Sequence, residues 1–420
     1  MKRTGSTAPS VVERQGHPQR RLVWLLGPAF VAAIAYVDPG NVAANLTAGA
    51  QHGYLLVWVL VAANVMAVMI QYLSAKLGLV TGRSLPEILG ARLSRGGRLA
   101  FWGQAELIAM ATDLAEVIGG AIALHILFGL PLPLGGLIVG IVSMALLTIQ
   151  SRHGQRPFEL VIMALLVLIT IGFVAGLLVS PMDWGAAAGG LVPRFEGTGT
   201  VLLAAGMLGA TVMPHAIYLH SSLARDRHGE GHTESGIRRL LHANRWDVVL
   251  ALIVAGSVNI AMLLLAASSL RGVEGTDTIQ GAHGAIVEAL GPVIGVIFGV
   301  GLLASGLAST SVGCYAGSAI MSGLLQRRIP LLARRVVTLI PALAILTVGV
   351  DPTWALVLSQ VFLSIGIPFA LVPLVRYTGM RSVMGRFING LGTQVFAWAI
   401  TVAIIALNLL LIYLTVTGAQ

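Results

Sequence analysis

The sequence contains little charge. Only 10% of its 420 residues are Asp, Glu, Lys or Arg, whereas 56% are hydrophobic and the mean hydropathy is +0.87. Because a soluble domain carries about a quarter charged residues, this composition excludes a soluble globular protein and predicts an all-α, polytopic membrane protein. Cysteine is almost absent too. The single Cys314 excludes an internal disulfide, and its stretch rich in Gly, Ser and Ala indicates a packed small residue.

The few charges are mostly positive, with a formal net charge of +9 at pH 7. Such an excess is also typical of nucleic-acid-binding proteins, but here the Lys and Arg residues lie in short clusters between apolar runs. The positive-inside rule places them there in membrane proteins. We therefore expect a lipid bilayer and not nucleic acid as the partner, and the sequence indicates no obligate protein partner.

Apolar runs long enough to cross a bilayer, about 20 residues, recur along the whole chain. They predict eleven membrane spans with the approximate bounds 22–50, 54–79, 99–128, 132–150, 157–180, 198–224, 241–270, 286–324, 330–350, 352–376 and 391–417. Residues 1–21 are polar and basic and are expected to form a disordered cytoplasmic tail. With that orientation, only Arg194 and Arg271 among the basic residues fall outside. The sequence therefore predicts a multi-pass protein of the cell membrane with its C-terminus outside.

The first span is interrupted by Asp38, Pro39, Gly40 and Asn41. Proline removes a backbone donor, glycine loosens the helix, and Asp38 brings an ionisable group to the expected bilayer midplane. Non-helical backbone at this depth is tolerated only where protein or a water-filled cavity surrounds it. One interpretation is a proline kink with a neutralised aspartate. We favour a broken helix whose gap binds a cation, because ionisable residues inside a membrane usually serve function.

The sixth span is interrupted in a similar way, by Gly209, Met213, Pro214 and His215. Taken alone, Met213 is equally well explained by core packing, and His215 by a hydrogen bond within the bundle. Span six, however, opens the second set of five spans as span one opens the first. Because five is odd, the second set enters the membrane from the opposite side. Paired Pro/Gly-interrupted helices at matching positions indicate an inverted-repeat transporter with its binding site at the midplane.

We therefore expect two five-helix repeats, at residues 22–180 and 198–377, and an extra eleventh helix at residues 391–418. The motif DPGN in the first span and MPH in the sixth resemble the signature of the Nramp family of proton-coupled divalent metal transporters, whose bacterial members of the MntH type carry manganese. The resemblance extends over nearly the whole chain, including GPAFVAAIAYVDPGN, GATVMPHAIYLHS and SQVFLSIGIPFALVPL. It implies a LeuT-like fold with a five-plus-five inverted repeat and one added helix.

The two interruptions together offer a mixed set of metal ligands. Asp38 supplies an anionic oxygen, Asn41 a neutral oxygen and Met213 a thioether, and the unwound segments add the backbone carbonyls of Ala35 and Ala210. An all-oxygen site suits Mg²⁺ or Ca²⁺, whereas a thioether shifts the preference toward Mn²⁺, Fe²⁺, Co²⁺ or Cd²⁺. The resemblance implies the same ligands, and we therefore expect a divalent transition metal as the transported ion.

The tenth span and the helix breakers have roles of their own in this prediction. The resemblance implies that Gln360 joins the metal in some states of the transport cycle. Pro39, Gly40, Gly209 and Pro214 are the expected hinges that let the half-helices swing. No cofactor is expected to remain bound.

Three carboxylates follow one face of the third span, since Glu106, Asp113 and Glu116 are separated by seven and three residues. Carboxylates aligned inside a membrane indicate a proton relay, although a purely structural network is the alternative. Arg334 and Arg335, near the cytoplasmic end of span nine, are the expected counter-charges. They could equally be ordinary positive-inside anchors.

Two further groups complete the predicted proton pathway. His215 titrates near neutrality and is able to accept or pass a proton. Asp38 is expected to be both a metal ligand and a proton acceptor. The resemblance implies roles in proton movement for Asp113, Glu116, His215 and the arginine pair.

The predicted mechanism is alternating access: metal displaces a proton from Asp38, and the proton leaves along span three. A sodium-coupled transporter of an organic substrate on the same fold remains the alternative. An intramembrane metalloprotease is disfavoured because no His-Glu-x-x-His motif occurs, so we expect a transporter and not an enzyme. A passive channel is disfavoured because two discontinuous helices at one depth favour an occluded site.

Overall fold

The computed structural model describes residues 26–229, 231–327 and 330–417, and the predicted tail at residues 1–21 lies outside them. Every regular element of this part of the chain is a helix. The first half contains α1 (Pro28–Ala33), η2 (Ile34–Val37), α2 (Pro39–His52), α3 (Val57–Thr81), α4 (Leu85–Arg92), α5 (Arg95–Phe128), α6 (Leu132–His153), α7 (Gln155–Val179) and α8 (Trp184–Gly189). The second half contains α9 (Thr198–Thr211), α10 (Pro214–His228), α11 (Glu234–Ser269), α12 (Ile279–Leu290), α13 (Pro292–Leu325), α14 (Leu331–Val348), α15 (Pro352–Thr378), α16 (Arg381–Met384), η3 (Gly385–Phe387) and α17 (Leu391–Thr417).

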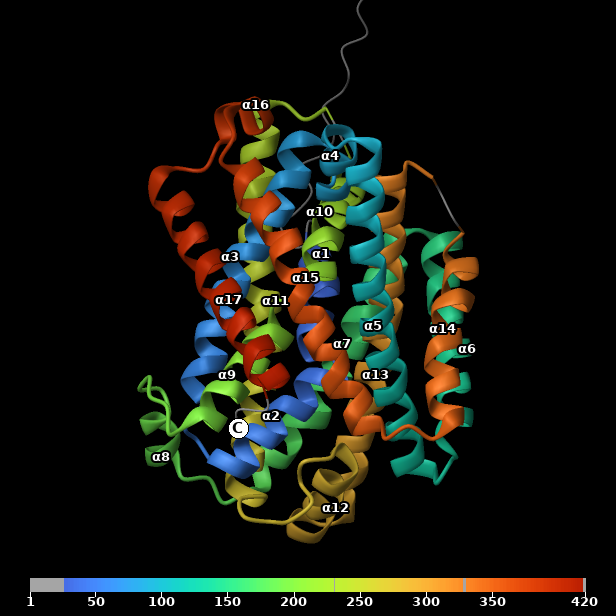
Figure 1. Ribbon diagram of the computed structural model, residues 1–420, viewed down its shortest axis with the longest axis vertical. Coiled ribbons are helices and arrows are strands. Elements are labelled where there is room, and N and C mark those ends of the chain that lie inside the picture. Colours follow the sequence, from blue (N-terminus) through green and yellow to red (C-terminus); the bar gives the residue numbers. More distant parts are fainter. Residues whose placement is uncertain (1–25, 230, 328–329, 418–420) are drawn as a thin grey trace, which may run out of the picture.

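The helices are mostly long, apolar and aligned with the longest axis of the molecule (Figure 1). Within the described ranges, nine helices are long and apolar enough to cross a membrane, α9 and α10 being counted as one. Shorter apolar stretches, Pro28–Val37 and Ile365–Thr378, lie in the first and tenth predicted spans. The structure therefore agrees with a multi-pass membrane protein, while the total of eleven spans stays a prediction.

Two helices differ from the approximate bounds of the predicted spans. The predicted eighth span, 286–324, contains two helices, because Gly291 with φ 92° ends α12 and Pro292 begins α13. Pro is favoured at the first position of a helix, where its missing N–H costs nothing. The predicted seventh span began too late: α11 starts at Glu234, where Thr233 caps it by accepting a hydrogen bond from the backbone N–H of Gly236.

Both predicted interruptions are present, and local chemistry explains where each helix restarts. Pro39 and Pro214 are the first residues of α2 and α10, and a residue that precedes proline is driven to extended backbone. The predicted hinge residues Gly40 and Gly209, by contrast, have helical backbone. The residues that leave the helical conformation are Asp38, Val212 and Met213.

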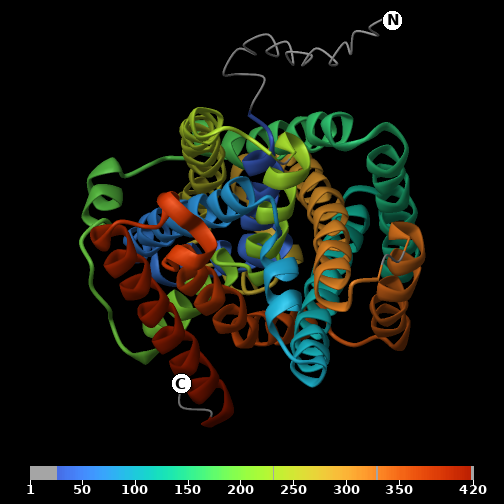
Figure 2. The ribbon, with the colours of Figure 1, turned by 90° about the horizontal axis from the view of Figure 1, so that it is seen from above.

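The two interrupted helices lie in the centre of the bundle and run in opposite directions. In Figure 1 the chain passes downward from α1 to α2 and upward from α9 to α10, and Figure 2 shows the other helices around them. α1 packs against α10 and α11, whereas α2 packs against α9 and α11. Opposite directions are what an inverted repeat requires, although the predicted repeat boundaries stay predictions.

Candidate metal site and proton pathway

Asp38 occupies the gap between η2 and α2, and its side chain is completely buried. Its backbone is extended, with φ −69° and ψ 166°, and its carboxylate caps α2. Oδ1 accepts hydrogen bonds from the backbone N–H of Asn41 at 2.9 Å and from Asn41 Nδ2 at 2.6 Å. Oδ2 has no hydrogen-bond partner among the described residues. One carboxylate oxygen therefore stays open in the centre of the bundle.

Asn41 joins the two interrupted helices. Its Nδ2 also donates to the backbone carbonyl of Ala210, near the end of α9, at 3.1 Å. The sequence predicted Asn41 as an oxygen ligand, but the structure turns its nitrogen toward this carbonyl and Asp38, because two acceptors at one place attract a donor. The Asp38 carboxylate, the Asn41 amide and the Ala210 carbonyl therefore share one set of hydrogen bonds.

Met213 and Gln360 come from two further elements. Met213 is the extended, fully buried residue that precedes α10, and it belongs to the same apolar cluster as Ala35 of η2. Gln360 lies on α15 beside Gly40. A β-carbon at Gly40 would collide with Gln360 Nε2 and would lie 3.1 Å from Asp38 Oδ2. A side chain at residue 40 would therefore displace the Gln360 amide, which lies on the same side of α2 as the open oxygen.

Two of the carboxylates of α5 form ion pairs with α14, of which the pair with Asp113 is buried and the pair with Glu106 is partly exposed. Arg335 Nη1 donates to both oxygens of Asp113 at 2.5 Å, and Arg335 Nε donates to Ser143 Oγ at 2.7 Å. Thr310 of α13 also donates to Asp113. Closer to the start of α5, Arg334 Nη2 donates to Glu106 at 2.7 Å. The arginine pair thus lies against carboxylates of span three, as expected of counter-charges.

Glu116 and His215 have a different environment. Glu116 lies almost one turn beyond Asp113 and is buried, and within the described ranges neither of its carboxylate oxygens has a hydrogen-bond partner. Its carboxylate lies against Gly313 of α13. His215 is also buried, at the second position of α10, and the described residues offer no hydrogen bond to either ring nitrogen. Such groups are able to exchange a proton without breaking an ion pair.

Two buried carboxylates were missed by the sequence analysis. Asp247 of α11 accepts hydrogen bonds from the backbone N–H groups of Gly27 and Ala29, both at 2.9 Å, so it caps α1 from a neighbouring helix. Glu159 of α7 forms an ion pair with Arg156 at 3.1 Å. Both acids fall inside predicted spans, 241–270 and 157–180, and an acid within an apolar span was the signal that could have found them.

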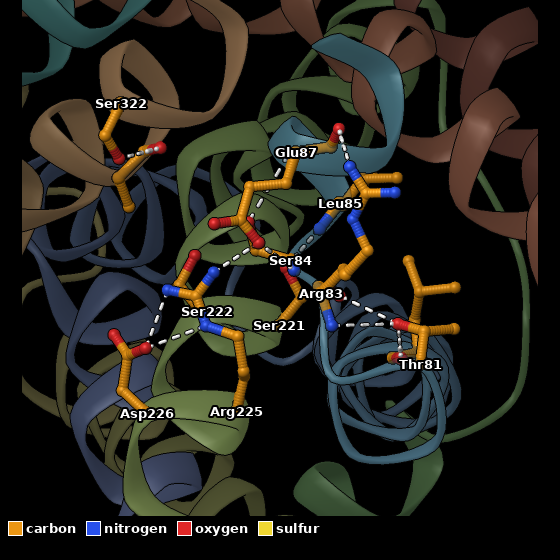
Figure 3. A network of polar contacts seen from close by, with 12 residues as sticks. Thr81, Arg83, Ser84, Leu85, Glu87, Ser221, Ser222, Arg225, Asp226 and Ser322 are labelled. Atoms are coloured by element: carbon orange, nitrogen blue, oxygen red, sulfur yellow. Dashed lines mark hydrogen bonds and ion pairs between the residues drawn. The ribbon is translucent and has the colours of Figure 1, made fainter. Parts of the chain in front are cut away.

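A further polar cluster lies where α4 meets α10 (Figure 3). Arg225 of α10 forms an ion pair with Glu87 of α4 and, at 2.6 Å, with Asp226. The backbone N–H of Leu85 donates to Ser221 Oγ at 2.9 Å. A polar cavity of about 1050 Å³ is lined by Glu87, Arg225 and Asp226. The basic loops of the sequence also lie at this end, which is the arrangement that the positive-inside rule predicts for a cytoplasmic side.

The chain folds locally into α4 because Ser84 and Glu87 form a capping box. Burial alone would raise the pKa of Glu87. The hydrogen bond from the backbone N–H of Ser84 and the charge of Arg225 outweigh burial and leave the pKa of Glu87 below its usual value. At neutral pH the Glu87 carboxylate is therefore ionised and holds α4 against α10.

The chemistry of the central site is that of a mixed cation site. The described residues contain no group of three or more His, Cys, Asp or Glu side chains that could hold a metal ion. A metal would instead rely on one carboxylate, an amide, a thioether and backbone carbonyls. Such a set carries one negative charge and one soft ligand, which suits a divalent transition metal more than Ca²⁺ or Mg²⁺.

Comparison with known sequences supports this class of protein. The family model for natural resistance-associated macrophage protein-like (Nramp) proteins matches residues 29–414. The divalent metal cation transporter MntH of Mycobacterium tuberculosis (strain CDC 1551 / Oshkosh) is 64% identical over 395 residues, which cover 94% of this chain and 92% of the relative. MntH of Bacillus subtilis (strain 168) is 46% identical over 398 residues, which cover 94% and 92%.

Solved structures give the same result for the fold. The manganese transporter of Eremococcus coleocola matches with a TM-score of 0.85 at 31% identity, covering 92% of this chain and 85% of that one. Mhp1, a nucleobase-cation-symport-1 family transporter, matches with a TM-score of 0.58 at 17% identity, covering 92% and 89%, a likeness that concerns the fold alone. The predicted LeuT-like fold is confirmed. Because the family model covers most of the chain and its relatives align over nearly their full length, this chain belongs to the natural resistance-associated macrophage protein (Nramp) family of membrane metal transporters.

Proposed function

We propose that the protein imports a divalent transition metal, Mn²⁺ and also Fe²⁺, Co²⁺ or Cd²⁺, together with protons. The names of its relatives, divalent metal cation transporter and manganese transporter, support this class of substrate. The observation that carries the proposal lies at the two breaks. Asp38 keeps one buried oxygen open while Asn41 joins it to the carbonyl of Ala210 in the opposite half of the chain.

Binding of the metal replaces a neutral hydrogen-bond donor with a cation. The cation takes the place of the Asn41 amide nitrogen between Asp38 and the Ala210 carbonyl, and the amide turns so that its oxygen faces the metal. Met213 adds its thioether and Ala35 its carbonyl. Because Ca²⁺ and Mg²⁺ bind sulfur poorly, the thioether disfavours these abundant ions. Gln360 of α15 joins the metal when that helix closes over the site.

Arrival of the metal displaces a proton from Asp38. The proton passes to Glu116 and His215, whose side chains have no hydrogen-bond partners among the described residues. Asp113 receives it next, and Arg335 stabilises the negative charge of Asp113 before and after the transfer. The pair of Glu106 and Arg334 extends this pathway toward the cytoplasmic end of α5.

Alternating access supplies the direction of transport. α1 and α10 swing about the residues that interrupt them, Asp38 and Met213. In this structure Asp247 caps α1, and Glu87 holds α10 through Arg225.

Uptake into liposomes tests the proposal. The purified protein is reconstituted and offered Mn²⁺, Cd²⁺, Ca²⁺ and Mg²⁺ side by side, with internal pH recorded and with Na⁺ present or absent. We expect uptake of Mn²⁺ and Cd²⁺ with internal acidification and without a need for Na⁺. Sodium-dependent uptake without acidification would instead support the sodium-coupled alternative.

A further inference from the structure

The break at Asp38 frees backbone carbonyls at the end of η2. The last carbonyls of a helix have no partner within it, and both Tyr36 and Val37 are buried. Buried backbone groups inside a membrane protein must find partners from elsewhere in the structure. How the freed carbonyls are divided among partners therefore decides which of them remains for a bound ion.

Two side chains from the second half of the sequence hold two of these carbonyls. Asn259 Nδ2 of α11 donates to the carbonyl of Tyr36 at 2.7 Å, and Ser305 Oγ of α13 donates to the carbonyl of Val37 at 2.5 Å. The amide of Asn259 is oriented by Asn45 of α2, whose Nδ2 donates to Asn259 Oδ1 at 2.9 Å. Because its oxygen is engaged in this way, the Asn259 nitrogen must face Tyr36.

The geometry of η2 makes these two hydrogen bonds matter for Ala35, the residue that precedes Tyr36. A 3₁₀-helix has about three residues per turn, so three successive residues point in three different directions around its axis. The carbonyls of Tyr36 and Val37 are turned toward α11 and α13. Ala35 is the third residue of this turn of η2. α9, which carries Ala210, also contacts η2.

We propose that Ser305 and Asn259 are positioning residues of the metal site. By holding the carbonyls of Tyr36 and Val37, they leave the carbonyl of Ala35 as the backbone ligand. They also keep Asp38, which directly follows Val37, at a constant distance from the Ala35 carbonyl. This inference rests on the proposed function. A rigid frame also discriminates by ion size, because Ca²⁺ needs oxygen distances of about 2.3–2.6 Å and smaller ions need shorter ones.

The decisive substitution is Ser305→Ala, which removes the donor to Val37. Mn²⁺ uptake into liposomes is measured over a range of concentrations, with Ca²⁺ as competitor, and Mn²⁺ affinity is measured by calorimetry in detergent. We expect the KM and the Kd for Mn²⁺ to rise roughly fivefold, the usual effect of one lost buried hydrogen bond. Ca²⁺ should compete at lower concentration because the loosened carbonyls accept a larger ion.

The chain offers a matched control on the same helix. Ser311 is also buried on α13, but its hydroxyl donates to Leu307 of its own helix at 2.7 Å. Ser311→Ala should leave KM and Ca²⁺ competition unchanged. Ser305→Thr, which keeps the hydroxyl, should restore the wild-type values. Should Ser305→Ala fail to fold, Ser305→Cys keeps the approximate size with a weaker donor and is expected to shift KM in the same direction.

The outcomes separate this inference from the proposed function. If the wild-type protein carries Mn²⁺ with protons and Ser305→Ala behaves like Ser311→Ala in both KM and Ca²⁺ competition, the positioning role is wrong. If Ser305→Ala lowers the maximal rate alone and Ser305→Thr does not rescue it, the hydroxyl serves packing, and the inference is again wrong. A wild-type protein that carries no divalent metal overturns the proposed function itself.

Discussion

Four carboxylates in and around the central site form two groups. Asp113 receives hydrogen bonds from Arg335 and Thr310, and Glu106 is paired with Arg334. By contrast, Asp38 Oδ2 and both carboxylate oxygens of Glu116 have no hydrogen-bond partner among the described residues. Three of them lie on α5, and Asp38 lies at the break between η2 and α2. The first group has fixed partners on neighbouring helices, and the second does not.

This difference shows where the protein holds its structure and where it keeps reactive groups. Removing one member of a buried ion pair leaves an uncompensated charge, which is strongly destabilising. A buried carboxylate with an open oxygen is costly to keep and is retained where it binds a cation or a proton. We therefore expect substitutions of Asp113 to affect mainly stability and proton movement. Substitutions of Asp38 should affect mainly transport.

The comparison is tested most severely by Asp38→Ala. We expect Mn²⁺ uptake into liposomes to fall by more than about a hundredfold, since even the outer partners of metal ligands are worth about 10- to 100-fold. The unfolding transition in detergent should move little, because a helix cap is worth only about 1 kcal/mol. Asp183→Ala is the matched control: Asp183 caps α8 through the N–H of Ala186, away from the site. Retained uptake by Asp38→Ala would remove this carboxylate from the metal site.

Asp113→Asn tests the paired group. It leaves Arg335 buried without its counter-charge, so we expect a loss of about 3–5 kcal/mol in the free energy of unfolding, measured by denaturant titration. Acidification of liposomes should decrease more than Mn²⁺ binding. Glu116→Gln should cost less than about 1 kcal/mol, because the structure shows no hydrogen bond for it to break. Equal destabilisation by both substitutions would contradict the division into two groups.

Met213→Leu asks whether the open oxygen of Asp38 acts together with sulfur. The substitution keeps the side-chain volume, so folding should be affected by less than about 1.5 kcal/mol. We expect Mn²⁺ uptake to continue while Ca²⁺ and Mg²⁺ become about tenfold better competitors, because the site then offers them no unfavourable thioether. Met207→Leu, at a fully buried methionine of α9, is the control. Unchanged competition by Met213→Leu would exclude a role for sulfur in selectivity.

The smallest effect is expected at the cytoplasmic contact between Glu87 and Arg225. The pKa of Glu87 is lowered in the folded protein, so its contribution to stability is present above its unfolded pKa and is lost as pH falls through its folded pKa. At neutral pH, Glu87→Gln should cost about 0.2–1 kcal/mol, because the pair is partly exposed. In acid the two proteins should unfold alike. A difference that persists in acid, or appears equally in Glu288→Gln on α12, would show that the ion pair is not its cause.

Much of the central site was predictable because its signals are local. An aspartate followed by proline is a helix start within any sequence, since the acid caps the helix and the proline tolerates its first position. The break at Asp38 follows from this rule, whereas at Met213 the following proline alone marks the helix start. The structure places the predicted hinge residues Gly40 and Gly209 within helices, and whether they act as hinges stays a prediction.

Other features depended on residues that are distant in the sequence. Asp247 caps α1 although 218 residues separate it from Ala29, and no local pattern predicts this contact. The orientation that the Asn41 amide takes in this structure also had no local signal, since the Ala210 carbonyl to which it donates lies 169 residues away. The roles of Ser305 and Asn259 also had no sequence signal, because a serine or an asparagine in a helix has many uses.

The sequence by itself determined that this protein lies in a membrane, that two of its helices are broken, and that an acid and a thioether occur at the breaks. Composition, the length of hydrophobic runs and the geometry of proline do not depend on contacts between distant residues, so they can be assessed without the tertiary structure. Only the tertiary structure decided which carboxylates are paired, which carbonyls are held and which oxygen stays open. Those outcomes depend on which side chains the packing of distant helices brings within hydrogen-bond distance.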